Sequence, residues 1–71
     1  MIKYPVLYSE LTKSKYDINK ICENLQNNDL NLSLLMGIII GEEPPTLNDA
    51  VVIKTVIGSD LSIEDLFKES E

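Results

Sequence analysis

Residues 30–40 read LNLSLLMGIII, a run in which most side chains are apolar. The run is far shorter than the roughly 20 residues that span a bilayer, so it indicates a helix covered by protein. At about 100° per residue, Leu30, Leu34 and Ile38 line up on one face of such a helix. The opposite face, which suits the core, carries Leu32, Leu35, Met36, Ile39 and Ile40. A helix that is apolar on both faces is hard to bury within a chain of 71 residues.

Capping and turn residues divide the chain into five short helical segments. The segment Glu42–Pro45 must be a loop, because Pro45 pushes the preceding residue out of helical geometry. Val51-Val52-Ile53 alone would also suit a strand, but the capping signals on both sides favour a helix. The expected helices run from about Pro5 to Ser14, from a cap at Asp17 to about Asn27, from a cap at Asp29 to Ile40, from Thr46 to Gly58, and from Ser62 into one short final helix.

The composition excludes several classes of protein. Twelve acidic residues against six lysines, with no arginine or histidine, give a net charge of −6, which opposes a general affinity for nucleic acid. The lone Cys22 cannot form an internal disulfide, and without histidine we expect no metal site and no cofactor. The absence of cysteine pairs and of an apolar leader sequence indicates a cytoplasmic protein. We therefore expect one all-α domain over residues 1–71, with neither a membrane nor a small-molecule substrate as its partner.

An enzymatic function finds little support in the sequence. Without histidine, the serines and Cys22 lack their commonest activating base, and the spacing Ile18, Ile21, Cys22, Leu25 places that cysteine in the core. The neighbouring acids Glu42–Glu43 and Glu64–Asp65 are typical of solubilising and capping groups. The three glycines are isolated, so they form no phosphate-binding loop. We expect no catalytic residue.

The order of these segments resembles a known family of small helical proteins. The resemblance lies in Tyr4-Pro5-Val6-Leu7, the spacing Ile18, Ile21, Cys22, Leu25, the Leu32-Ser33 and Met36 of the third segment, and two stretches near the end, 47–53 (LNDAVVI) and 61–67 (LSIEDLF). Together these resemble the Cro/CI-type helix-turn-helix family, also called the xenobiotic-response-element family, and particularly its small phage-borne members. The resemblance implies a compact five-helix bundle of the lambda-repressor-like type and, for a phage protein, residence in the host cytoplasm.

Two departures from the family pattern bear on function. The family has a small residue, an apolar residue and serine after the second helix, where this chain has Gln26-Asn27-Asn28. The third helix and its loop are also about one turn longer than is usual. In this family the start of the third helix enters the major groove and reads bases with polar or basic side chains, but here that helix carries no cation and begins near Asp29.

Three kinds of contact could therefore cover the apolar face Leu30, Leu34, Ile38: the Glu42–Pro45 loop, a homodimer interface, or another protein. Exposed apolar stripes with polar rims mark interaction surfaces, which favours an intermolecular contact. The first hypothesis is a phage-type protein that acts by protein–protein interaction, as an inhibitor, an antirepressor or an anti-defence factor such as an anti-CRISPR. Its partner-binding residues would be the apolar Leu30, Leu34 and Ile38 with the acidic rim Asp29, Glu42 and Glu43.

The alternative is a transcriptional regulator that binds DNA as a dimer. The residues that would read bases are Asn27, Asn28, Asn31 and Ser33, and those that would touch phosphate are Lys13, Lys15 and Lys20. The lysines are interspersed with Asp17 and Glu23, a pattern more typical of a solvated face.

Overall fold

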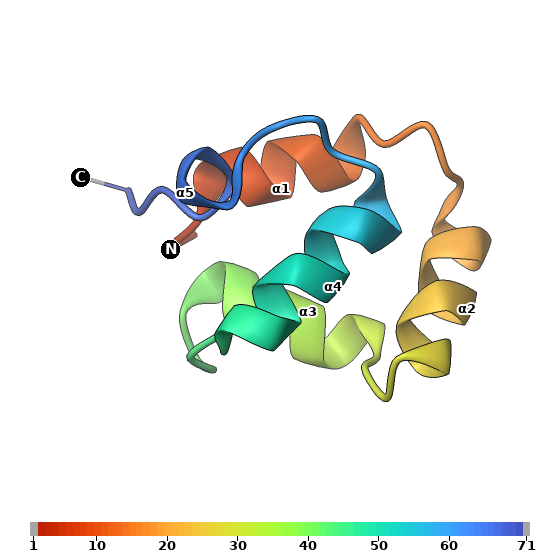
Figure 1. The fold of residues 1–71 in the computed structure, drawn as a ribbon. Helices are drawn as coiled ribbons and strands as arrows, with labels where there is room; N and C mark the ends of the chain where they lie inside the picture. The colour runs from red at the N-terminus through yellow and green to blue at the C-terminus, as the bar shows by residue number, and fades with distance from the viewer. Residues whose placement is uncertain (1, 71) are drawn as a thin grey trace.

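The chain folds into an all-helical bundle, seen in a computed structural model that describes residues 2–70 (Figure 1). Five helices and no strand occur in this part of the chain, as the sequence predicts. The helices are α1 (Pro5–Thr12), α2 (Ile18–Asn27), α3 (Leu32–Ile40), α4 (Leu47–Ile57) and α5 (Ile63–Leu66). None of the helices in the described range has the length and apolar character needed to cross a membrane.

The helix ends follow the local capping chemistry. The side chain of Asp17 accepts a hydrogen bond from the Lys20 amide at 2.8 Å, and that of Ser62 accepts one from the Asp65 amide at 3.1 Å. Thr46 and Asp49 form the reciprocal capping box at the start of α4. Gly41 and Gly58 end α3 and α4 in the left-handed conformation, with φ of 91° and 67°. These sequence-based predictions are confirmed.

Two predicted helix boundaries are wrong. α1 ends at Thr12 and not at Ser14, because the chain turns there and the Ser14 hydroxyl donates to the carbonyl of Ile57 at 2.8 Å. α3 begins at Leu32, and its cap is Asn31 and not Asp29. Asp29 instead takes a left-handed φ of 61° in the turn, which leaves Leu30 outside the helix.

All five helices contribute to one apolar core. Its fully enclosed side chains are Leu7, Ile21, Leu25, Leu35, Ile38, Ile39, Ile53, Ile57 and Leu66. α2 packs against α4, α1 packs against α3, and α5 closes the bundle against α1 and α4. The edge-to-face contact between Tyr4 and Phe67, with ring centroids 5.4 Å apart, joins the two ends of the described chain.

Two residues of the stripe expected on α2 lie outside the core. Ile18 is 51% exposed, and Cys22 is half-buried. The fully enclosed residues of α2 are Ile21 and Leu25. Ile18 is the first residue of the helix, one turn before Ile21, so it stands at the margin of this contact. The prediction of a core position for Ile18 is therefore wrong.

Candidate interaction surface

Apart from the lysines, the side chains predicted to bind a partner or DNA lie on α3 or close to its two ends. Asn27 at the end of α2, Asn28 and Asn31 in the α2–α3 connection, and Ser33 in the first turn of α3 are all exposed. Two of these amides are already used at helix ends. The Asn28 Nδ2 group donates to the Asn24 carbonyl at 2.8 Å, and the Asn31 Oδ1 atom accepts from the Leu34 amide at 2.8 Å.

The predicted apolar stripe is not a free surface. Ile38 is 1% exposed and belongs to the core, so its expected contact with a partner is wrong. Leu30 and Leu34 are half-buried and pack against the same core, which leaves only part of each side chain accessible. Ile40, expected in the core, is instead 40% exposed at the end of the helix.

Backbone hydrogen bonds hold the N-terminal segment and the loop after α3 against the C-terminal end of this helix. The Lys3 and Tyr4 amides both donate to the Ile39 carbonyl, at 2.8 and 3.1 Å, so the N-terminal segment lies against the end of the helix. The Glu42 and Glu43 amides fold back to the Gly37 carbonyl, at 2.8 and 3.2 Å. A Cβ atom on Gly37 would lie 3.2 Å from Cγ of Glu43. Within the chain, the loop after α3 therefore covers the side on which Gly37 lies.

The three predicted rim carboxylates are all exposed. Asp29 lies in the turn before α3, whereas Glu42 and Glu43 lie in the loop after it. Negative charge therefore flanks both ends of the helix that would have to approach a phosphate backbone.

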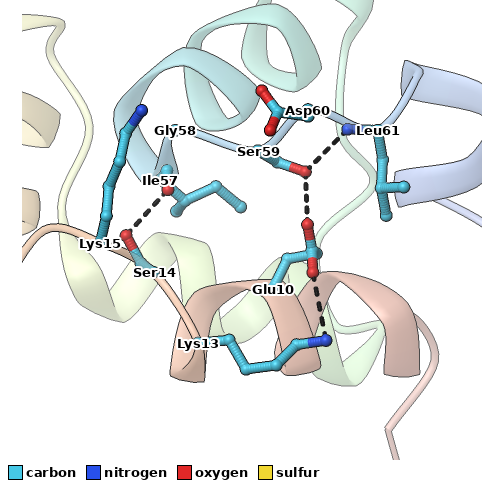
Figure 2. Close-up of a pocket in the computed structure, with 9 residues that line it drawn as sticks. All are labelled: Glu10, Lys13, Ser14, Lys15, Ile57, Gly58, Ser59, Asp60 and Leu61. Atoms are coloured by element: carbon cyan, nitrogen blue, oxygen red, sulfur yellow. Dashed lines mark hydrogen bonds and ion pairs between the residues drawn. The ribbon is translucent and has the colours of Figure 1, made fainter.

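The three lysines proposed for phosphate contact do not form one group. Lys13 and Lys15 line a surface hollow of about 270 Å³ between the end of α1 and the α4–α5 connection (Figure 2). The Lys13 ammonium lies 3.5 Å from the Glu10 carboxylate, and that of Lys15 lies 5.5 Å from the Tyr16 ring centre. Lys20 lines a different hollow of about 330 Å³, which it shares with Asn28.

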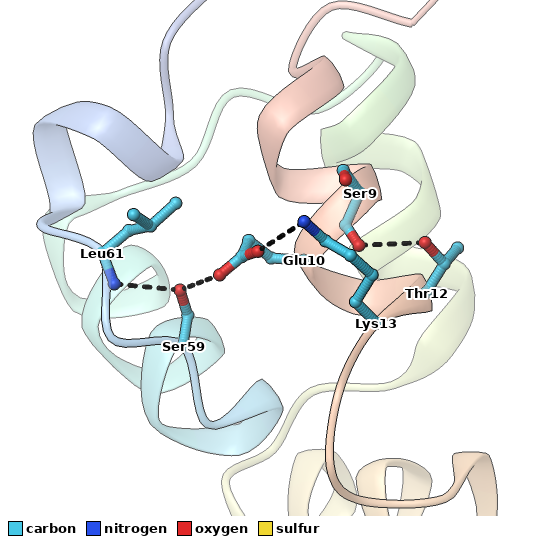
Figure 3. A network of polar contacts seen from close by, with 6 residues as sticks. All are labelled: Ser9, Glu10, Thr12, Lys13, Ser59 and Leu61. Atoms are coloured by element: carbon cyan, nitrogen blue, oxygen red, sulfur yellow. Dashed lines mark hydrogen bonds and ion pairs between the residues drawn. The ribbon is translucent and has the colours of Figure 1, made fainter.

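A polar network crosses the first hollow and ties α1 to the α4–α5 connection (Figure 3). The Ser59 hydroxyl donates to the Glu10 carboxylate at 2.7 Å and accepts from the Leu61 amide at 3.2 Å. The hydrogen bond from Ser59 is the main cause that lowers the pKa of Glu10, and Lys13 lowers it further. The serine–glutamate pair therefore joins α1 to the connection between α4 and α5.

The network predicts an acid-sensitive contribution to stability. Because folding lowers the pKa of Glu10, its contribution is complete above the unfolded-state pKa and is lost as the pH falls through the folded-state pKa. Ser59→Ala should therefore lower the free energy of unfolding at pH 7, and the deficit should narrow at acid pH. Urea unfolding from pH 7 to pH 3 measures this, with the exposed Ser33→Ala as control. A deficit of constant size would contradict the role given to Glu10.

One exposed apolar surface was not recognised in the sequence. Leu47 is 75% exposed and Val51 is 46% exposed, one turn apart on α4. Ala50, Ile53 and Ile57 of the same helix are buried. The signal was present as two interleaved spacings, 47–51 and 50–53–57, which place the two groups on different faces. We call Leu47, Val51 and the exposed Thr55 the α4 outer face.

Comparison of the chain with family models, curated proteins and solved structures found no match. Within residues 2–70, no three side chains of the metal-ligating types gather closely enough to hold an ion. The candidate site is therefore defined by the surface of the molecule: an acid-flanked α3 and the apolar outer face of α4.

Proposed function

We propose that this chain is a small protein of helix-turn-helix type that acts by binding another protein rather than by reading DNA. The observation that carries the proposal is the character of α3, which has no cation and has its apolar residues Leu35, Ile38 and Ile39 enclosed in the core. The proposed type rests on the order of the five helices and on the short connection of residues 28–31, after which α3 turns away from α2 (Figure 1).

The charge distribution supports the choice of a protein partner. A DNA-reading helix is flanked by groups that neutralise phosphate, whereas α3 has Asp29 before it and Glu42 and Glu43 after it. Lys13 is already paired with Glu10, and Lys20 lines a separate hollow. The polar candidates Asn28 and Asn31 hold helix ends and are only partly free to contact bases.

Exposed apolar surface supplies the positive support. Leu47 and Val51 keep much of their side-chain surface in water, and removal of apolar surface from water yields about 25 cal/mol per Å². Apolar side chains beside charged groups are typical of protein-binding surfaces. The inhibitor, antirepressor and anti-defence roles of the first hypothesis are all forms of this proposal.

A DNA-binding assay tests the proposal against the regulator alternative. The full chain is titrated against duplexes from the DNA flanking its own gene and against a scrambled duplex, at low and at physiological salt. We expect no preference between the duplexes. Tight, sequence-dependent binding with a steep salt slope, lost in the Asn31→Ala/Ser33→Ala double variant, would replace the proposal with the DNA-binding regulator.

A further inference from the structure

The α4 outer face forms a single apolar ridge. Leu47, Val51 and Thr55 follow the i, i+4, i+8 spacing that places side chains in one row along a helix. Exposure along this ridge is greatest at its start, with Leu47 at 75% and Val51 at 46%. Leu47 is the first residue of α4. The ridge therefore projects its most exposed side chain next to the loop that contains Glu42 and Glu43.

The start of this ridge is acidic, whereas Lys54 and Lys20 lie beside Thr55 at its other end. Residues 41–53 include three carboxylates, Glu42, Glu43 and Asp49, and no cation. Asp49 is held in the capping box with Thr46, but Glu42 and Glu43 are exposed and make no ion pair within the described chain. At about 3.5 Å per residue, Glu43 lies within about 14 Å of Leu47, close enough for one partner element to contact both.

We propose that the α4 outer face docks against a basic amphipathic helix of another protein, an inference that rests on the protein-binding function proposed above. A row of side chains at i, i+4 spacing packs into the groove between similar rows on a second helix. Leu47 and Val51 would pack against the partner's apolar side chains, and Glu42 and Glu43 would meet its lysines or arginines.

The charges favour such a partner over a second copy of this chain. The nearest cation on α4 is Lys54, whose ammonium group already donates to the Ser59 carbonyl at 3.0 Å. Lys20, beside Thr55, is a cation that a second copy could bring to this face, but the net charge of −6 makes two copies of the chain repel each other. A basic amphipathic helix would offer apolar side chains to the ridge and cations to Glu42 and Glu43.

Two synthetic peptides test the proposal with a defined probe. One is a helical leucine–lysine peptide and the other a leucine–glutamate peptide with the same leucine positions. Fluorescence anisotropy with the full chain should detect binding of the lysine peptide only. The Leu47→Ser/Val51→Ser double variant, which keeps the net charge, should bind at least tenfold more weakly, because it removes both apolar anchors.

A charge-matched pair of variants separates docking from general attraction. Glu42→Gln/Glu43→Gln should weaken binding several-fold, whereas Glu23→Gln/Glu64→Gln, with the same change in net charge, should change it little. The proposal is overturned if the Leu47→Ser/Val51→Ser variant binds as the wild type does, or if both pairs of glutamate variants weaken binding equally.

Sedimentation of the chain alone tests whether a second copy of the chain, and not a basic helix, covers the α4 outer face. A monomer in both forms supports the proposal, whereas a wild-type dimer that dissociates on Leu47→Ser/Val51→Ser would assign the face to a second copy. Failure of the peptide experiment together with absent DNA preference would leave the protein-binding function standing and remove only the basic helix. Sequence-dependent DNA binding would remove both.

Discussion

Gly58→Ala is expected to lower the free energy of unfolding by about 2–4 kcal/mol, a large part of the stability of so small a domain. Gly58 ends α4 with a φ of 67°, where an L side chain is strained. The new Cβ atom would also lie 2.8 Å from Cε2 of Tyr16 and 3.0 Å from Cε of Lys15. Urea unfolding followed by circular dichroism measures the loss.

Gly37→Ala is the matched control because it makes the same chemical change inside a helix. Gly37 lies in α3 with ordinary helical geometry, where alanine is favoured over glycine by about 1 kcal/mol. Its Cβ atom would lie 3.2 Å from Cγ and 3.9 Å from Cβ of Glu43, whose side chain is exposed and able to move. We expect stability to be unchanged or slightly raised. An equal loss in both variants would show that packing around the new methyl group, and not the backbone conformation at Gly58, controls the effect.

Helix ends were the most predictable part of this fold because capping chemistry is local. Asp17, Thr46 and Ser62 each bond an amide three residues later, and Gly41 supplies the left-handed residue after α3. The start of α3 was predicted wrongly because Asp29, a residue type that often caps helices, stands two residues before Asn31, which is the actual cap. The turn decides between them: the Leu30 amide donates to the Leu25 carbonyl at 2.8 Å, which delays the helix.

The faces of the helices were less predictable than their ends. Helical spacing separates the apolar residues of α3 into two rows, but it does not say which parts of the rest of the chain cover each row. The contacts at the end of α3 illustrate this, because residues 3–4 bond to the Ile39 carbonyl from far away in the sequence and Glu43 lies against Gly37. The bond between Glu10 and Ser59 joins residues 49 positions apart, and no local pattern predicts it.

The exposure of the acidic rim was predicted correctly, whereas that of the apolar stripe was not. Asp29, Glu42 and Glu43 are exposed, as their charge predicts. The apolar surface beside Glu42 and Glu43 is now assigned to α4 and no longer to Ile38. Leu47 and Val51 stand among other apolar residues of α4, and only the buried positions of Ala50 and Ile53 separate the two faces.

Ile38→Glu is expected to abolish folding, whereas Ile40→Glu is expected to be tolerated. Ile38 is 1% exposed and Ile40 is 40% exposed. The sequence pattern predicted the reverse, with Ile38 on the exposed face and Ile40 on the core face. The buried substitution removes apolar contacts worth about 2–5 kcal/mol and encloses a carboxylate at a further cost of several kcal/mol. Their sum equals or exceeds the whole stability expected for 71 residues, about 4–10 kcal/mol.

Far-ultraviolet circular dichroism and thermal unfolding of the two variants test whether Ile38 is buried and Ile40 is exposed. Ile38→Glu should lack a cooperative transition at pH 7, and Ile40→Glu should unfold within about 1 kcal/mol of the wild type. A folded, cooperative Ile38→Glu protein would mean that this side chain reaches solvent. In that case the stripe Leu30, Leu34, Ile38 would again be the best candidate for the protein-binding surface. An unfolded Ile38→Glu beside a folded Ile40→Glu would leave the α4 outer face as the principal exposed apolar surface next to the acidic loop.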